Sequence, residues 1–421
     1  MRRSTLLILE PHAAGHHAAW VRWISTQMVT RGWKVVIASH RTSLDQAPFG
    51  WLSHRGPDIS VVSTDAALSD GAQSRHGSLL WNEIRRYRFL RQLYRRARST
   101  HEPDAVLLPF GDYIMHAVAL LGSPFGATPW AAVVMRPTFH HRAVGVQGPV
   151  PSAAGLRRRL FLSFLRTRSL LRCFTIDETL YQYVHSLNAR SLKRLAPKVQ
   201  YLPDPALGMT PIDRDEARRM LGLSSQATIV LLFGSVGERK GVRHLIAALH
   251  ALQRPDLQAL IVGRVEDDAR PALDSPQALE LRRAGRLHLI EGWVGDDTER
   301  AAFCAADIAW LGYRGHWRSS GVFVQSARAG LPLLACDEGL IGWLTRRYGC
   351  GLAVRVIDQA EVADALDRLA SSASLRQELG GRAQRAFARH SIEDAGAVLA
   401  GALEDSLRCE LHERSPSARS A

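Results

Sequence analysis

Two kinds of segment alternate along the chain. Short runs of four to eight apolar residues recur as far as residue 336, and longer amphipathic segments with helical spacing separate most of them. The predicted strands are residues 5–9, 33–38, 104–109, 130–135, 173–176, 227–233, 257–262, 286–290, 307–311 and 332–336. Continuous apolar strands that alternate with helices predict an α/β protein with parallel sheets covered on both faces.

The alternation is interrupted once, between Gln200 and Asp215, where the chain reads Y-L-P-D-P-A-L-G-M-T-P-I-D-R-D. Three prolines and a glycine are typical of a linker, and 421 residues exceed the usual limit of a single core. We therefore predict a Rossmann-like domain at 1–205 and a second at 206–390. A C-terminal helix at 391–411 could pack back on the first domain, and the polar residues 412–421 are expected to form a disordered tail.

Composition excludes several classes of protein. No apolar run reaches the roughly 18 residues that a membrane span needs, and the apolar run before Glu10 is too short for a signal peptide. The five cysteines are scattered without a C-x-x-C pair. They indicate reduced thiols in a cytoplasmic protein, without a disulfide framework or a zinc site.

The net charge of +14 is concentrated in one half of the chain. Residues 1–200 carry +16 and residues 201–421 carry −2. Two arginine-rich amphipathic stretches, 84–98 and 156–172, favour either an anionic membrane surface or acidic partner, or core-facing helices whose solvent side is arginine-rich. The chain has no zinc-finger spacing and no RNA-binding motif, so we do not predict nucleic-acid binding.

Residues 233–241, F-G-S-V-G-E-R-K-G, connect a predicted strand to a predicted helix. A strand-to-helix turn presents backbone N–H groups, and the helix dipole adds positive charge. With Arg239 and Lys240 beside it, the turn is a candidate seat for a phosphate or diphosphate. The alternative is a solvated pair of cations at a helix start.

Four blocks resemble the donor domain of the retaining glycosyltransferase family 4. They are the stretch from Phe233 to Leu249, L-Q-A-L-I-V-G-R, L-H-L-I-E-G-W-V-G-D-D-T-E-R-A-A-F-C-A-A-D, and S-S-G-V-F-V-Q-S-A-R-A-G-L-P-L-L-A-C-D-E-G. The resemblance implies the GT-B fold, in which two doubly wound Rossmann-like domains face each other across a cleft. It implies donor-binding roles for Gly15, Ser235, Arg239, Lys240, Gly263, Trp293, Val294, Ser319, Ser320, Gly321, Val322 and Gln325.

This chain departs from the family pattern at two positions. The signature normally contains two glutamates, of which the second binds the ribose of the nucleotide and the first meets the donor sugar. Gln325 and Trp317 occupy these positions, with His316 next to Trp317. A glutamine still accepts a hydrogen bond from a ribose hydroxyl but lacks the charge. An early arginine of the phosphate loop is replaced by Ser235.

The N-terminal half contributes candidates at the ends of three predicted strands. Gly15, with His16 and His17, resembles the family's glycine-containing first loop, although a solvent-exposed histidine pair is an equal alternative. Asp112 could bind an acceptor hydroxyl or cap the next helix. His140, His141 and His116 each resemble the histidine that touches the donor sugar. We take His140, Asp112 and His16 as the catalytic candidates.

These features predict a cytoplasmic, metal-independent glycosyltransferase that moves a sugar from a nucleotide-sugar donor to an acceptor hydroxyl. Retention of configuration is implied by the resemblance alone. No cofactor or metal is expected, and Asp213-Arg214-Asp215 is read as a helix cap. The basic half suits a phosphate-bearing or lipid-linked acceptor and peripheral membrane binding. A binding protein with a decayed donor site, or a sugar-nucleotide epimerase, is the alternative.

Overall fold

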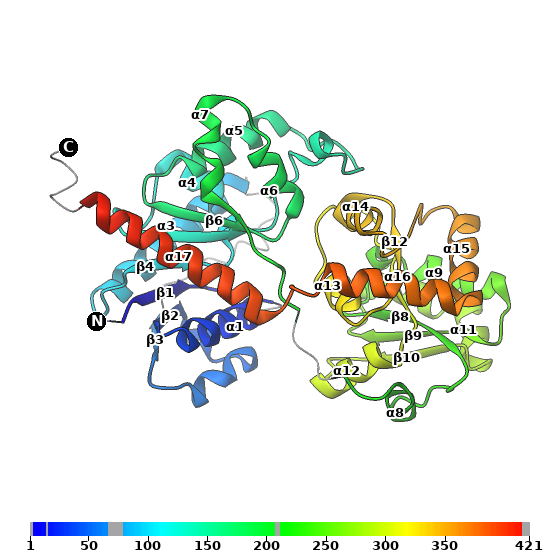
Figure 1. Ribbon diagram of the computed structural model, residues 1–421. Coiled ribbons are helices and arrows are strands. Elements are labelled where there is room, and N and C mark those ends of the chain that lie inside the picture. The colour runs from blue at the N-terminus through cyan, green and yellow to red at the C-terminus, as the bar shows by residue number, and fades with distance from the viewer. Residues whose placement is uncertain (1–2, 14–15, 66–78, 207–210, 415–421) are drawn as a thin grey trace. The chain divides into compact units, whose positions relative to one another are not determined.

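The computed structural model describes residues 3–13, 16–65, 79–206 and 211–414. The chain divides into two compact units. The first contains residues 1–140, 150–203 and 392–421, and the second contains 141–149 and 204–391. Each unit is a parallel sheet with helices against its faces (Figure 1), as the alternating sequence pattern predicts.

The first sheet has seven strands in the order β3-β2-β1-β4-β5-β6-β7. They are β1 (Thr5–Leu9), β2 (Lys34–His40), β3 (Ile59–Thr64), β4 (Ala105–Leu108), β5 (Trp130–Val134), β6 (Leu170–Thr175) and β7 (Val199–Tyr201). The longer helices of this unit are α1 (His17–Thr30), α3 (Leu79–Arg98), α4 (Met115–Leu121), α5 (Ala154–Leu165), α6 (Glu178–His185) and α17 (Ile392–Arg414), and the short ones are α2 (Arg41–Leu44) and α7 (Arg190–Lys193).

Both faces of the first sheet are buried, because successive side chains of a strand point to opposite faces. On β1, Leu6 and Ile8 lie in a core with residues of α1 and α17. Leu7 and Leu9 lie in a second core with residues of α3, α4 and α5. A strand with two buried faces needs a continuous apolar run, which is the signal the sequence carries here.

The second sheet has six strands in the order β10-β9-β8-β11-β12-β13. They are β8 (Thr228–Phe233), β9 (Leu257–Gly263), β10 (Leu287–Glu291), β11 (Ile308–Leu311), β12 (Leu333–Cys336) and β13 (Gly351–Val354). Its helices are α8 (Arg214–Met220), α9 (Val242–Leu252), α10 (Arg270–Leu273), α11 (Pro276–Arg283), α12 (Asp296–Ala305), α13 (Gly321–Arg328), α14 (Gly339–Tyr348), α15 (Gln359–Ser371) and α16 (Ala373–Ala386).

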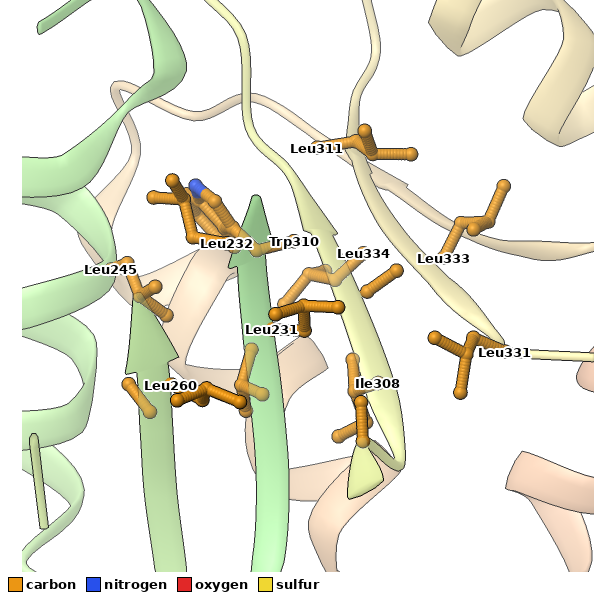
Figure 2. Packing of buried hydrophobic residues seen from close by; sticks show 14 of the residues in the cluster. Leu231, Leu232, Leu245, Leu260, Ile308, Trp310, Leu311, Leu331, Leu333 and Leu334 are labelled. Atoms are coloured by element: carbon orange, nitrogen blue, oxygen red, sulfur yellow. The ribbon is translucent and has the colours of Figure 1, made fainter. Parts of the chain in front are cut away.

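The core of the second unit is centred on the three middle strands. Figure 2 shows Leu231 and Leu232 on β8, Leu260 on β9, and Ile308 and Trp310 on β11 among their buried neighbours. Trp310 is one of the largest fully buried side chains of the protein. Its indole therefore supports the strand ends at which the loops described below begin.

Three strands are missed by the apolar-run pattern. β3 (I-S-V-V-S-T) and β7 lie at the two edges of the first sheet, and β13 begins at a glycine at an edge of the second. An edge strand buries less side-chain area, so it needs no long apolar run. β7 also lies within the segment that was read as the start of a linker.

The remaining boundaries differ in detail. Residues 141–149 group with the second unit, whereas the sequence pattern placed them in the first. The C-terminal helix α17 contacts α1 and β6 and runs to Arg414 instead of 411. Residues 415–421 of the predicted tail lie outside the described residues. Asp213 accepts hydrogen bonds from the N–H groups of Asp215 and Glu216, which confirms its role as a helix cap.

The first arginine-rich stretch, 84–98, lies in α3, and the second lies in α5 only as far as Leu165 and then continues into β6. On α3 the side chains of Phe89, Leu93 and Ala97 are buried, while Arg88 and Arg95 are exposed. The helix is thus core-facing with a basic solvent side. None of the described helices has both the length and the apolar character required to cross a bilayer.

Candidate functional site

The second sheet reverses its strand order between β8 and β11, since β9 and β10 lie on one side of this pair and β12 and β13 on the other. In open parallel sheets, ligands bind beyond the carboxyl ends of the strands at such a switch point. The turn after β8 contains Arg239 and Lys240, and the loop after β11 contains Tyr313, His316 and the serines that precede α13. The predicted diphosphate residues therefore lie at the expected place in the sheet.

Arg239 and Lys240 are held by different contacts. An Nη of Arg239 donates to Nδ1 of His316 at 2.8 Å, and the guanidinium lies 5.6 Å from the centre of the Tyr313 ring. Lys240 is buried, with its ammonium donating to the carbonyl of Phe233 and lying 5.4 Å from the same ring. We call Arg239, Lys240, Tyr313 and His316 the cation cluster. Lys240 is therefore not a solvated cation, whereas Arg239 remains exposed.

His316 is fixed as a neutral imidazole. Its Nε2–H donates to the carbonyl of Ser319 at 3.0 Å, which leaves Nδ1 as the acceptor for Arg239. Burial lowers the pKa of His316, and the nearby Arg239, Arg318 and Lys240 lower it further, against the opposing hydrogen bond to Ser319. The ring thus orients the guanidinium without adding a third positive charge.

The turn is anchored from below by the core. The indole N–H of Trp310 donates to the carbonyl of Lys240 at 2.8 Å. Gly263 at the end of β9 has a φ of +131°, and a Cβ there would overlap the carbonyl oxygen of Gly234. Only a glycine allows β9 to approach the turn so closely. Ser235 donates to Glu266 at 2.5 Å, so it holds the neighbouring loop.

The start of α13 carries the remaining predicted phosphate contacts. Ser320 precedes the helix at Gly321, and its hydroxyl lies 3.3 Å from the hydroxyl of Tyr313. Val322 lies beside Gly234 of the first turn. The N–H groups of a helix N-terminus and the cation cluster thus converge on one side of the β8–β11 switch point.

The two departures from the signature have different surroundings. Trp317 packs against Gly148, because a Cβ on Gly148 would lie only 2.9 Å from the indole. The neighbouring residue Gln147 accepts a hydrogen bond at its carbonyl from the N–H of Gly339 at 2.7 Å. Trp317 therefore acts as a packing residue within the second unit. Gln325 instead donates from Nε2 to Oε1 of Glu299 on α12 at 2.5 Å. Glu299 was not singled out from the sequence, where nothing links it to residue 325.

The predicted donor-binding residues Trp293 and Val294 lie between β10 and α12. Trp293 has 90% of its surface exposed, which is unusual for so large an apolar side chain. Val294 packs against the core at the same place. This arrangement offers an aromatic surface next to the helix that carries Glu299.

The first sheet also has a switch point, between β1 and β4. There, His17 Nδ1 lies 3.0 Å from Oε1 of the buried Glu10, and His17 Nε2 lies 3.3 Å from the hydroxyl of Tyr113. The imidazole also lies against Phe110 at a centroid distance of 4.0 Å. His17 is thus held by its neighbours, whereas His16, the chosen candidate, is an exposed residue at the start of α1. Gly15 lies outside the described residues.

Two arginines flank Tyr113. Arg136 donates to its hydroxyl at 3.0 Å and lies 4.5 Å from the ring centre, and Arg86 of α3 lies 4.8 Å from the same ring. Asp112 accepts from the N–H groups of Met135 and Arg136 at 2.8 and 2.9 Å. It joins the loops after β4 and β5 and does not cap α4, which has no side-chain cap, so the capping interpretation is wrong.

The histidine candidates after β4 and β5 are engaged in structural contacts. His140 has no exposed surface, and its Nε2 lies 3.1 Å from Oδ2 of Asp177 and 3.0 Å from the hydroxyl of Thr179. Asp177 caps α6, so His140 supports that cap and cannot touch a substrate in this conformation. His116 Nδ1 lies 2.7 Å from Glu83 of α3. Sequence spacing indicates neither partner, because each lies on a separate helix.

Part of the chain is similar to known proteins. Residues 227–372 match the family model described as "Glycosyl transferases group 1". The chain is 27% identical over 230 residues to a D-inositol 3-phosphate glycosyltransferase of Stackebrandtia nassauensis, covering 51% of this chain and 50% of that protein. It is 28% identical over 196 residues to an alpha-D-kanosaminyltransferase of Streptomyces kanamyceticus, covering 46% and 49%. The chain thus spans about half the length of the curated relatives it matches.

Solved structures share the fold over nearly the whole chain. A sucrose-phosphate synthase from Thermosynechococcus elongatus has a TM-score of 0.66 at 15% identity, covering 97% of this chain and all of that one. Anabaena HepE in complex with UDP and glucose has a TM-score of 0.62 at 14% identity, covering 96% and 100%. These neighbours are GT-B glycosyltransferases, so the predicted fold class of two Rossmann-like domains is confirmed.

Proposed function

We propose that the protein transfers a sugar from a nucleotide-sugar donor to an acceptor hydroxyl, because residues 227–372 match the model of the glycosyl transferases group 1. The observation that carries the proposal is the cation cluster at the β8–β11 switch point. Arg239 is aimed by a neutral histidine, and Lys240 and the start of α13 lie beside it. Anabaena HepE, which has the same fold, was solved in complex with UDP, and this supports a nucleotide donor.

The chemistry follows from the charges. A nucleoside diphosphate leaving group gains negative charge as its bond to the sugar breaks, and preorganised cations and helix N–H groups stabilise that charge. Arg239 and Lys240 would do this without a metal ion. Retention of configuration suits a site in which the departing phosphate takes the acceptor proton. No enzymic base is then required, so the structural roles found for His140 and Asp112 are compatible with activity.

Nucleotide binding provides the first test. Wild-type protein would be titrated by calorimetry with UDP, GDP, ADP and TDP, beside Arg239→Ala. We expect one nucleotide to bind, and the variant to bind it about tenfold to a hundredfold more weakly, since a charge-assisted hydrogen bond is lost. Arg283→Ala removes the same charge from the last turn of α11, which precedes the edge strand β10, away from the switch point. This variant should bind the nucleotide with wild-type affinity.

Two outcomes would count against this proposal. Equal affinity of Arg239→Ala and wild type would remove the cation cluster from donor binding. If folded wild-type protein bound none of the four nucleotides, the alternative of a decayed donor site would be favoured, with Trp317 as its main sign. The epimerase alternative gains no support from the geometry, because the histidines and carboxylates of the described loops hold structural contacts.

For the acceptor, we propose a phosphate-bearing molecule. Arg86 and Arg136 flank Tyr113 at the switch point of the first sheet, where two guanidinium groups suit a phosphate. The relative from Stackebrandtia nassauensis is named for D-inositol 3-phosphate. A mixture of phosphorylated and unphosphorylated sugars and cyclitols, supplied with the bound nucleotide's glucose conjugate, would test this preference by product analysis.

We further propose that the arginine-rich face of α3 associates with anionic lipid. The exposed Trp81 lies among these arginines. The centre of its ring is 5.9 Å from Cζ of Arg85 and 6.0 Å from Cζ of Arg88. An aromatic side chain among cations suits the interface of a bilayer. This would bring the protein to a lipid-linked acceptor.

A further inference from the structure

Residues 141–149, which we call the strap, belong to the second unit although they come from the N-terminal half of the chain. The strap follows β5 and precedes α5, and both of these elements belong to the first unit. Whatever the strap holds in the second unit is therefore also connected, along the chain, to a central strand of the first sheet.

The strap contacts the N-terminus of α14. The N–H of Gly339, the first residue of this helix, donates to the carbonyl of Gln147 at 2.7 Å. The N–H of Leu340, the second residue, donates to the carbonyl of Trp317 at 3.2 Å. The first N–H groups of a helix have no partner within the helix, so they need acceptors from elsewhere. The strap supplies one acceptor and the loop after β11 supplies the next.

Trp317 lies between the strap and α14. On one side, a Cβ on Gly148 of the strap would lie 2.9 Å from the indole. On the other side, a Cβ on Gly339 would lie 2.9 Å from Cα of Trp317 and 2.5 Å from the carbonyl oxygen of His316. Side chains other than hydrogen would not fit at either place, so two glycines allow the strap and the helix to enclose this loop.

The enclosed loop carries the histidine that orients Arg239. His316 directly precedes Trp317, and its Nδ1 accepts from the guanidinium at 2.8 Å. A charge-assisted hydrogen bond of this kind depends on the direction of its acceptor. A shift of the backbone at Trp317 would move the imidazole, and the guanidinium would lose its fixed direction. Consecutive contacts therefore connect Gly148 of the strap with the cation cluster.

We infer that the strap is a positioning element of the donor site: Gly148 and Trp317 act through His316 to direct Arg239 toward the donor diphosphate. This role rests on the proposed glycosyltransferase function, in which Arg239 binds that diphosphate. It gives the tryptophan a task in a working site. In a decayed donor site, by contrast, the indole would have no effect on nucleotide binding.

Calorimetry with the full chain tests this role, using whichever of UDP, GDP, ADP and TDP binds to wild type. Trp317→Ala removes the indole from the strap, and Gly148→Ala places a methyl group against it. Each variant should bind the nucleotide about tenfold more weakly, since the guanidinium is no longer directed. The double variant should bind no more weakly than the single variants, because both changes break the same contact.

A second background separates positioning from a general loss of structure. In Arg239→Ala the guanidinium that the strap positions is absent, so the addition of Trp317→Ala should not weaken nucleotide binding further. Gly145→Ala is the matched control for backbone strain within the strap. Gly145 has a φ of +76°, but nothing lies within 4 Å of a Cβ there. This control should bind the nucleotide with wild-type affinity.

The positioning role is overturned if wild type binds a nucleotide and Trp317→Ala binds it equally well. It is also overturned if Trp317→Ala weakens binding as much in the Arg239→Ala background as in wild type, or if Gly145→Ala is as weak as Gly148→Ala. Trp317→Leu replaces Trp317→Ala, with the same expectations, if thermal unfolding shows that the alanine variant is not folded. Absence of binding by folded wild type overturns the proposed function itself, so the two failures are distinguishable.

Discussion

At the scale of single residues, His316 shows how a side chain is tuned by its neighbours. It accepts from Arg239 and donates to Ser319, so both ring nitrogens are used by one tautomer. Protonation would replace the acceptor by a donor facing a guanidinium. The lowered pKa of His316, caused first by burial and then by the adjacent cations, keeps the ring neutral near pH 7.

This lowered pKa predicts a stability change in mildly acidic solution. Below pH 6.5, the ordinary pKa of about 6.5 means that His316 is protonated in the unfolded chain, whereas it stays neutral in the folded chain. The free energy of unfolding therefore falls as the pH decreases below 6.5. His316→Gln cannot titrate and should lose less stability between pH 7.5 and pH 5. Urea unfolding at both pH values measures this. Identical losses in variant and wild type would show that the titration of His316 is not the cause.

At the scale of elements, the strand β8, its turn and the helix α9 form one supported unit. The Trp310 indole from β11 holds the Lys240 carbonyl, and Gly263 lets β9 lie against the turn. Phosphate contacts depend on the position of the turn within fractions of an ångström. We therefore expect the core tryptophan to affect nucleotide affinity through the position of this turn.

Trp310→Phe keeps most of the apolar volume and removes the indole N–H. The buried carbonyl of Lys240 would lose this donor, so we expect a loss of about 1–3 kcal/mol in unfolding free energy. Nucleotide affinity should fall as well, because the turn is less fixed. Thermal unfolding and calorimetry measure the two effects. As a comparison, Trp23→Phe changes a buried tryptophan of the first unit and should leave nucleotide affinity unchanged.

The basic face of α3 predicts salt-sensitive lipid binding. In vesicle sedimentation, binding should rise with phosphatidylserine content and fall with added salt. Arg88→Gln with Arg95→Gln should lower it about thirtyfold, since each basic residue near an anionic surface contributes about 1 kcal/mol. The pair Arg219→Gln and Arg283→Gln removes the same charge from the second unit. Lipid binding that ignores salt, or that responds equally to both pairs, would contradict the proposal.

At the scale of the whole molecule, the chain passes between the two units after His140, Pro149, Pro203 and Ser391. The connections that follow Pro203 and Ser391 meet at one place in the second unit. There, Ala206 donates to the carbonyl of His390 at 3.0 Å, and Arg328 of α13 donates to the carbonyls of both residues at 3.1 Å. The helix that begins at the cation cluster is thus tied to the connections between the units.

Asp204 lies in the connection that follows Pro203, and burial raises its pKa to about 7. The folded chain binds the proton more tightly than the unfolded one, so the contribution to stability is present below pH 4 and lost as the pH rises through 7. Asp204→Asn should stabilise the protein at pH 8, by at most about 4 kcal/mol. The gain should shrink toward pH 4. Denaturant unfolding of wild type and Asp204→Asn at pH 8 and pH 4 measures the two gains. Equal gains at both pH values would show that the variant stabilises through packing and not through the loss of an ionisable group.

Much of the fold and part of the site could be predicted from the sequence. The ten predicted strands all occur, because a strand buried on both faces requires an apolar run of its own. Arg239, Lys240 and Ser320 could be placed because they lie in the loops that connect such strands to the next helices. His140 could not be judged in this way, since its burial depends on Asp177 and α6, which no local pattern connects with it.

The sequence by itself determined the ten strands with continuous apolar runs and the turns that follow them, because these depend on the period of apolar residues and on local turn chemistry. Only the tertiary structure decided the partners. Arg239 meets His316 from 77 residues away, and Gln325 meets Glu299 from 26. Such contacts depend on how helices pack across a whole sheet. Through this packing, His316 orients the guanidinium of Arg239, and the carboxylate of Glu299 on α12 lies beside Gln325 on α13.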